Sequence, residues 1–267
     1  MIKTRIDRCF DDLKAKNKKG LVTFITAGDP NYSTSLKILN GLPAAGASMI
    51  ELGMPFTDPM ADGPAIQASS LRALKSGQNM IKTFDLVRDF RKTNQDTPII
   101  LMGYYNPIYI YGNDKFLEDA FKVGVDGLIV VDLPPEEDDE LCLKAIEKGI
   151  SFIRLATPTT DNKRLGRVLK NTSGFLYYVS IAGITGSATP EINDVRDAII
   201  RIKNHTNLPI AVGFGVKTKQ NVEDMAKIAD AIIVGSALVS LINNNDKADS
   251  SVVVDVLNKV TELAEGL

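Results

Sequence analysis

The sequence predicts an α/β fold of the (β/α)8 class, a TIM barrel formed by residues 1–267 as a single domain. Eight short β-rich runs alternate with longer helical patterns from one end of the chain to the other. The runs are largely apolar, as is typical of strands that are buried on both faces of a parallel sheet. The length of 267 residues also suits one barrel, for which about 250 is usual. An open doubly wound sheet is the alternative, but no GxGxxG motif follows the first run to support it.

The expected elements follow one another in a regular order. Strands are expected at 21–26, 48–54, 98–103, 127–132, 151–157, 175–181, 209–215 and 230–236. Before them, one helical stripe consists of Ile2, Ile6, Cys9, Phe10 and Leu13, and we expect this N-terminal helix to plug the barrel bottom. Between the strands, helices are expected after Ser33, at 65–74, at 80–91, from Glu136, from Pro190 and after Thr218. A short extra helix is expected after the eighth strand, and a last helix at 252–263.

Composition excludes several classes of function. Lys and Arg total 31 and Asp and Glu total 33, so the net charge of −2 gives no basic surface for nucleic acid. A single histidine, His205, cannot form a histidine-rich metal site, and we expect it at a solvated helix end. The two cysteines, Cys9 and Cys142, are expected to be unpaired thiols in a reducing compartment. No signal peptide and no membrane-spanning run is found, which indicates a soluble cytoplasmic protein.

The second expected strand contains an acidic residue, Glu51, between Ile50 and Leu52. If the two aliphatic side chains face the helices, strand alternation directs Glu51 into the barrel. A buried carboxylate is costly unless it is paired or functional, and burial raises its pKa towards neutrality, which suits a general acid–base group. The alternative is a structural ion pair, for which Arg154 is the only basic residue within an expected strand.

Further candidates lie at the strand ends, where barrels of this class carry their active sites. Asp62 could supply a second carboxylate, or could simply form a turn with Gly63. The sixth, seventh and eighth strands are followed by glycine-rich segments, GITGSA, GFGVKT and GSALVSLI, whose backbone N–H groups suit a phosphate. No lysine lies within a strand and Lys217 falls in a glycine turn, so a Schiff-base aldolase has no obvious nucleophile. These residues indicate carboxylate acid–base chemistry on a phosphorylated substrate, without a metal.

The stretch ELGMPFTDPMADGPAIQ, at 51–67, resembles the signature of the tryptophan synthase alpha chain family. Further matches are FITAGDP (24–30), LMGYYNP (101–107), VDLPPEE (131–137), YYVSIAGITG (177–186), GFGV (213–216) and VGSALV (234–239), so the resemblance covers nearly the whole chain. It implies a (β/α)8 barrel and a lyase, which performs the retro-aldol cleavage of indole-3-glycerol phosphate to indole and glyceraldehyde 3-phosphate. The indole would pass to a beta chain for tryptophan synthesis.

The resemblance also implies roles for individual residues. Glu51 would be the acid–base group at indole C3 and at the glycerol hydroxyl, and Asp62 would accept a hydrogen bond from the indole N–H. Substrate-lining positions would be Phe24, Tyr104, Tyr177 and Thr185, the last of which would contact Asp62 when its loop closes. The phosphate cradle would consist of Gly186, Phe214, Gly215, Gly235 and Ser236. Taken without the resemblance, Tyr177 could equally be a core residue beside Phe175 and Val179.

The partner that the resemblance implies is the tryptophan synthase beta chain, in an allosteric α2β2 heterotetramer. The expected contacts are Asp58, Pro59, Asn106 with Pro107, and Pro134. Pyridoxal phosphate would be the cofactor of that beta chain, and no cofactor is expected in this chain.

Two positions depart from the family pattern. Met60 stands where many members have Leu, and Ile181 stands where several have Arg, which affects contacts of the loop after the sixth strand. Two other functions stay open at this point: an isomerase or epimerase of another sugar phosphate, and a catalytically silent subunit that only activates the beta chain. The 51–67 stretch disfavours the first, and the presence of both Glu51 and Asp62 disfavours the second.

Overall fold

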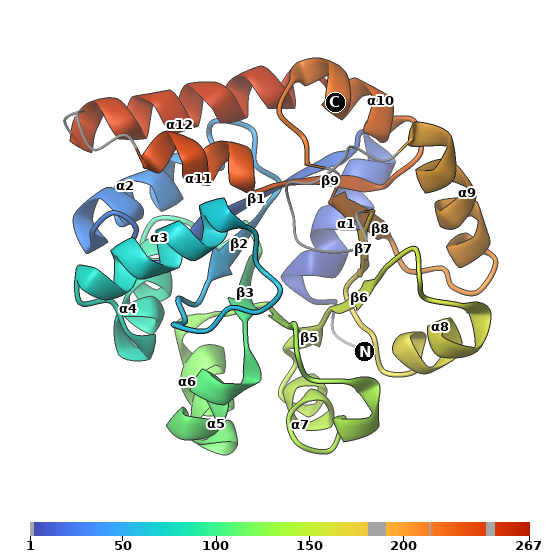
Figure 1. Ribbon diagram of the computed structural model, residues 1–267, viewed down its shortest axis with the longest axis horizontal. Helices are drawn as coiled ribbons and strands as arrows, with labels where there is room; N and C mark the ends of the chain where they lie inside the picture. Colours follow the sequence, from blue (N-terminus) through green and yellow to red (C-terminus); the bar gives the residue numbers. More distant parts are fainter. Residues whose placement is uncertain (1–2, 181–190, 214, 244–248) are drawn as a thin grey trace.

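The computed structural model describes residues 3–180, 191–213, 215–243 and 249–267. Its strands form a ring of parallel pairs with helices around the outside (Figure 1). The strands are β1 (Gly20–Thr26), β2 (Met49–Gly53), β3 (Ile99–Gly103), β4 (Gly127–Val130), β5 (Ser151–Phe152), β6 (Arg154–Ala156), β7 (Leu176–Val179), β8 (Ile210–Gly213) and β9 (Ala231–Val234). They pair in the order β5-β4-β3-β2-β1-β9-β8-β7-β6, so the predicted (β/α)8 barrel is confirmed.

The strand expected at 151–157 is not continuous in the structure. It is divided at Ile153 into β5, which pairs with β4, and β6, which pairs with β7. The N–H of Ile153 donates to the carbonyl of Leu128 at 2.9 Å, so Ile153 is still hydrogen-bonded to β4. β5 and β6 are the two ends of the pairing order, and only Ile153 separates them in the sequence. The covalent chain at Ile153 therefore closes the ring.

All helices but α1, which closes the bottom of the barrel, lie outside the strands and pack on them through a continuous apolar layer. The helices are α1 (Arg5–Ala15), α2 (Tyr32–Gly41), α3 (Pro64–Lys75), α4 (Met80–Arg91), α5 (Tyr105–Tyr111), α6 (Asn113–Val123), α7 (Cys142–Glu147), α8 (Asn162–Leu169), α9 (Ile192–Lys203), α10 (Lys219–Ala226), α11 (Ser236–Ile242) and α12 (Asp249–Ala264). The expected helices at 65–74 and 80–91 correspond to α3 and α4, and Thr218 caps α10.

The segment from Glu136 does not form the single helix expected there. A short 3₁₀ turn at Pro135–Glu137 is followed by α7, which begins at Cys142. Asp138 separates the two, and its carboxylate accepts from Asn171 Nδ2 at 2.6 Å and from the Arg154 guanidinium. A side chain that turns inward to pair with a buried arginine explains why the helix is interrupted. The expected start of the next helix, Pro190, lies outside the described residues.

The N-terminal helix plugs the barrel, as expected. Ile6 and Phe10 belong to the cluster of side chains inside the barrel, with Cys9 and Leu13 packed against it. The aromatic rings of Phe10 and Phe175 meet edge to face, with centroids 5.8 Å apart. Ile2 lies outside the described residues.

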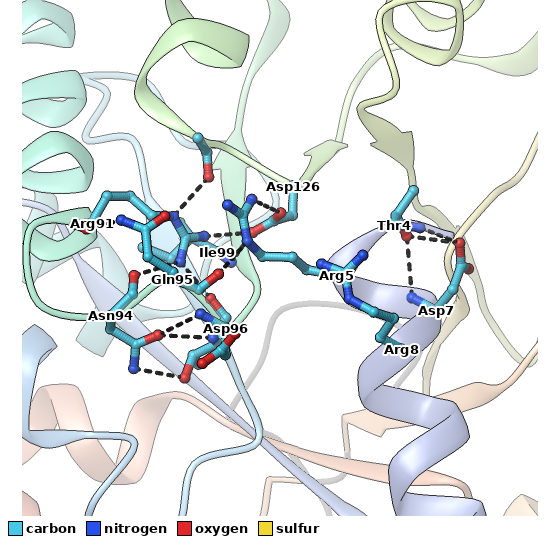
Figure 2. Close-up of polar contacts among 12 residues, drawn as sticks. Thr4, Arg5, Asp7, Arg8, Arg91, Asn94, Gln95, Asp96, Ile99 and Asp126 are labelled. Carbon is cyan, nitrogen blue, oxygen red and sulfur yellow. Dashed lines mark hydrogen bonds and ion pairs between the residues drawn. The ribbon is translucent and has the colours of Figure 1, made fainter. Parts of the chain in front are cut away.

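A polar cluster fixes this helix to the bottom of the barrel (Figure 2). Arg5 donates to Asp126 at 2.8 Å and to the carbonyl of Gln95 at 2.5 Å. The other carboxylate oxygen of Asp126 accepts from Arg91 at 2.6 Å and from the N–H of Ile99 at 2.8 Å. Asp126 and Arg91 are both buried, so each neutralises a charge that would otherwise be costly in the interior.

No helix in the described part of the chain is long and apolar enough to span a membrane.

Candidate active site

Glu51 lies in the middle of β2 and faces the inside of the barrel. Its neighbours Ile50 and Leu52 belong to the outer apolar layer, whereas Met49 belongs to the inner cluster, as the alternation predicts. The side chain is completely buried, and neither carboxyl oxygen has a hydrogen-bond partner among the described residues. Burial raises the pKa of Glu51 to about 8, because the charged form loses its hydration without compensation. At neutral pH this carboxyl group therefore holds its proton.

The alternative, an ion pair between Glu51 and Arg154, is wrong. Arg154 donates to the carbonyl of Leu133 at 2.5 Å and forms an ion pair with Asp138. Its guanidinium lies over the ring of Phe152, 4.8 Å from the centroid, and Phe152 belongs to the outer apolar layer. Arg154 thus supports the barrel wall from outside and leaves Glu51 without a cation.

Asp62 lies in the loop between β2 and α3, just before Gly63, which is the N-cap residue of the helix. Its N–H donates to the carbonyl of Pro59 at 3.2 Å, which closes a turn before Asp62 instead of the turn with Gly63 considered from the sequence, and its own carbonyl accepts from Gln67 Nε2 at 2.8 Å. Partial burial raises the pKa of its carboxyl group to about 6, and a hydrogen bond from the Tyr104 hydroxyl acts in the opposite direction. Asp62 is therefore mostly ionised at neutral pH, in contrast to Glu51.

Tyr104 fixes the loop that contains Asp62. Its buried ring lies 5.6 Å from that of Phe56, measured between centroids, and its hydroxyl accepts from the N–H of Ala61 at 3.0 Å. Burial and the charge of Asp62 raise the pKa of the Tyr104 hydroxyl, so it stays protonated and donates to the carboxylate. The Phe56 contact and the Ala61 hydrogen bond were not predicted from the sequence, because they depend on how the loop folds back over β3.

Tyr177 and Phe24 complete the inner surface near the two carboxyl groups. Tyr177 is partly buried, and its pKa is raised by burial and by the charges of both Glu51 and Asp62, so all three groups influence the same space. Phe24 is the β1 residue paired with Glu51 in the strand register. A Cβ added at Gly53 would lie 2.6 Å from Phe24 Cζ, which shows that the aromatic ring occupies the space a side chain would fill there.

Two of the expected phosphate residues lie at the start of α11. Gly235 is its N-cap residue and Ser236 its first residue, and both are partly exposed. Phe24 lies nearby, because a Cβ added at Gly235 would be 3.4 Å from the Cβ of Phe24. Gly215, after β8, is exposed and has φ of 65°, a left-handed conformation that favours glycine. Three of the expected site residues, Thr185, Gly186 and Phe214, lie outside the described residues, as does Ile181.

The expected partner contacts follow three neighbouring strands, two on the loop after β2, one in the first turn of α5 and one after β4. Asp58 is exposed and Pro59 partly exposed after β2, Asn106 is exposed after β3, and Pro134 is exposed after β4. These segments follow the same ends of the parallel strands as the Asp62 loop, so the four residues border the mouth of the barrel. Met60, which is 72 % exposed, lies on the same loop as Asp58.

The remaining groups considered from the sequence are His205, Lys217 and the two cysteines. His205 follows α9 and is exposed, and Lys217 is exposed before α10. Both cysteines are free, and burial raises the pKa of each thiol to about 11. Within the described ranges, no group of three or more His, Cys, Asp or Glu side chains could hold a metal ion.

Comparisons with known proteins point to one family. A family model described as tryptophan synthase alpha chain matches residues 10–267. The chain is similar to tryptophan synthase subunit alpha of Legionella pneumophila, with 37 % identity, 100 % of each chain covered and a TM-score of 0.90. A chain of the tryptophan synthase complex from Pyrococcus furiosus has 40 % identity and a TM-score of 0.83, with 91 % of this chain and 97 % of that chain covered. A chain of Mycobacterium tuberculosis tryptophan synthase has 28 % identity, 99 % coverage of both chains and a TM-score of 0.88.

Proposed function

The chain belongs to the tryptophan synthase alpha chain family, whose reaction is the cleavage of indole-3-glycerol phosphate, and we propose that Glu51 and Asp62 carry the acid–base steps of that reaction. The reaction is a retro-aldol cleavage that yields indole and glyceraldehyde 3-phosphate. Indole C3 must gain a proton, the glycerol hydroxyl next to it must lose one, and the C–C bond between them must break. The observation that carries the proposal is the complete burial of Glu51 on the inner wall without a hydrogen-bond partner among the described residues.

Glu51 is suited to both proton transfers in turn. With a pKa of about 8 it is protonated at neutral pH and can donate to C3, which converts the indole ring to a cationic indolenine. The resulting carboxylate then takes the proton of the glycerol hydroxyl. The C–C bond electrons return to the ring as the aldehyde forms, and Glu51 regains its starting state without an added acid or base.

Asp62 is suited to stabilise the positive charge on the ring. Its pKa of about 6 leaves it mostly ionised at neutral pH, so it can accept a hydrogen bond from the indole N–H throughout the reaction. The Tyr104 hydroxyl orients the carboxylate. Phe24 and Tyr177 supply the adjacent aromatic surface, against which we place the flat indole ring and the glycerol chain.

The phosphate group of the substrate is assigned to the ends of β8 and β9. The first N–H groups of a helix have no acceptor within the helix, so the N-terminus of α11, at Gly235 and Ser236, is suited to an anion. Gly215 lies in the turn that follows the neighbouring strand β8. By the resemblance, Thr185, Gly186 and Phe214 would join the substrate and phosphate contacts.

The partner of this chain is assigned as the tryptophan synthase beta chain, in an α2β2 complex in which the beta chain holds pyridoxal phosphate and receives the indole. The similar chains from Pyrococcus furiosus and Mycobacterium tuberculosis come from tryptophan synthase structures, which supports such a partner. Asp58, Pro59, Asn106 and Pro134 form the proposed contact surface around the barrel mouth. A cytoplasmic location is proposed as well, and it is supported by the two free thiols.

Indole release by the isolated chain tests the catalytic assignment. Glu51→Gln and Asp62→Asn should each lower turnover by about 10²–10⁴-fold, the usual effect of removing a general acid–base group. Glu147→Gln, at an exposed position at the end of α7, is the matched control and should keep full activity. Turnover of the Glu51→Gln variant close to that of the wild type would refute the proposed role of Glu51.

A further inference from the structure

The helix that follows Asp62 rests on the barrel through a small and mostly polar face. The buried residues of α3 are Ser69, Ser70 and Ala73. Ser69 Oγ lies 2.6 Å from Thr26 Oγ1 at the end of β1, and both side chains are buried. Side chains of this size remove little apolar surface from water, so apolar packing does little to fix the position of α3. Polar contacts must therefore carry much of that task.

Arg72 provides the strongest of these contacts and extends in two directions. Its Nε and Nη2 donate to the carboxylate of Asp29 at 2.8 and 2.7 Å, and Asp29 is buried in the segment after β1. Its Nη1 donates to the side-chain oxygen of Asn243 at 2.8 Å, and Asn243 is the C-cap residue of α11. A planar guanidinium is suited to bind one carboxylate with two parallel bonds while a further N–H stays available.

The two helices joined in this way each carry one part of the site. Helices α3 and α11 pack side by side (Figure 1). Asp62 precedes the N-terminus of α3 and is fastened to it by the hydrogen bond from Gln67 to its carbonyl. Gly235 and Ser236 form the N-terminus of α11. Arg72 and Asn243 lie towards the opposite ends of the same helices, so a movement of one helix is passed to the other through their hydrogen bond.

We propose that Arg72 is a positioning residue that couples the binding of the substrate phosphate at α11 to the placement of Asp62 beside the indole ring. A phosphate held at Gly235 and Ser236 favours one position of α11, and Arg72 extends that preference to α3 and hence to Asp62. Coupling between two sites is reciprocal, so indole and the phosphate must each raise the affinity for the other. The proposal rests on the roles assigned above to Asp62 and to the start of α11.

The test measures the dissociation constant of indole by calorimetry, with and without saturating glycerol 3-phosphate. In the wild type, glycerol 3-phosphate should lower the dissociation constant of indole about fivefold or more, the lower end of typical coupling. The Asn243→Ala variant loses only the exposed side chain that accepts from Arg72. In this variant glycerol 3-phosphate should lower the dissociation constant of indole less than about twofold, while each ligand alone binds as in the wild type. Asn204→Ala is the matched control, because Asn204 is an exposed C-cap residue of α9, and it should keep the full coupling.

A second variant guards against effects on folding. Arg72→Lys keeps a positive charge for Asp29 but cannot hold Asp29 and Asn243 at once, so it should lose the coupling too. Coupling that persists in both variants, or that is absent from the wild type, overturns the proposal.

The Gly235→Asp variant distinguishes a failure of this proposal from a failure of the proposed function. If it binds glycerol 3-phosphate like the wild type, the phosphate assignment falls and this proposal falls with it. If that assignment holds and coupling persists in Asn243→Ala, only the role of Arg72 is wrong.

Discussion

Replacing Glu51 by Gln should make the free energy of unfolding less sensitive to pH, besides lowering turnover. Gln is nearly isosteric with Glu but does not ionise. The variant therefore lacks the pH-dependent loss of stability that a buried carboxyl group with a raised pKa causes. Glu51 has a pKa of about 8 in the folded protein, against an ordinary value of 4.5. A carboxyl group whose pKa is raised by folding destabilises the folded state wherever the unfolded state has released the proton.

The size of this effect follows from the two pKa values. Below pH 4.5 both states hold the proton, and Glu51 contributes no pH dependence. Between 4.5 and about 8 only the unfolded state ionises, so stability falls by about 1.4 kcal/mol for each pH unit gained. Above about 8 the loss is complete, and over the whole interval it amounts to about 5 kcal/mol. Glu51→Gln should therefore gain stability relative to the wild type across this window.

Urea unfolding of both proteins at a series of pH values between about 5 and about 9 measures this difference. The other titrating groups are common to both chains, so their contributions cancel when the two free energies are subtracted. The advantage of Glu51→Gln should grow by about 4 kcal/mol from pH 5 to pH 8 and then level off. Two curves that run parallel would show that Glu51 is solvated or paired in the folded protein, and the reasoning from its isolation would be refuted.

Four further outcomes are expected. The pH profile of kcat/KM for cleavage should be bell-shaped, because activity needs Asp62 ionised above about 6 and Glu51 protonated below about 8, and a profile flat between pH 5 and 9 would contradict this. Asp62→Asn should lower turnover about 10²-fold or more but leave the calorimetric affinity for glycerol 3-phosphate unchanged, and a joint loss would mean that Asp62 shapes the phosphate site. Gly235→Asp should weaken the binding of glycerol 3-phosphate about tenfold or more, because its carboxylate repels the phosphate. Gly235→Ala should bind glycerol 3-phosphate nearly as the wild type does, since its Cβ would lie 3.4 Å from the Cβ of Phe24, an ordinary contact distance. Equal binding by the wild type and both variants would contradict the phosphate assignment. Asp126→Ala should destabilise the fold by about 3–5 kcal/mol, because it leaves the buried Arg91 without its carboxylate, and an unchanged melting temperature would show that the cluster is solvated.

The order of strands and helices could be predicted from the sequence because burial on both faces leaves a direct mark on composition. A parallel strand inside a ring of helices has no face to water, so the runs from 21–26 to 230–236 read as short apolar segments. The division of the fifth run at Ile153 leaves no such mark. The division arises because Ser151 and Phe152 pair with β4, whereas Arg154, Leu155 and Ala156 pair with β7. Which strand each residue pairs with is decided only when the ring closes.

The candidate site could be predicted only in part, and Glu51 and Arg154 show why. Alternation with Ile50 and Leu52 was enough to direct Glu51 inward. The same rule cannot say which face of 151–157 is inward, because each face combines apolar and polar side chains: Ser151, Ile153, Leu155 and Thr157 on one, and Phe152, Arg154 and Ala156 on the other. Ile153 belongs to the inner cluster and Leu155 packs against it, which directs Arg154 outward to Asp138. Its partner lies in an irregular segment between a 3₁₀ turn and α7, for which no periodic pattern exists.

Glu51 has no cationic partner among the residues that the structure describes, and this is what the proposed chemistry requires. A guanidinium beside Glu51 would lower the stability cost of burying it, but it would also hold the carboxylate ionised at neutral pH, with no proton to give to indole C3. Hydrogen-bond donors to its oxygens would act in the same direction. Asp62 represents the other case, because the hydrogen bond from Tyr104 opposes the effect of burial and keeps its pKa nearer the ordinary range. Glu51 and Asp62 both influence the pKa of the Tyr177 hydroxyl, yet their different surroundings keep Glu51 protonated and Asp62 ionised at neutral pH. The loss of stability comes mainly from Glu51, which must carry the proton.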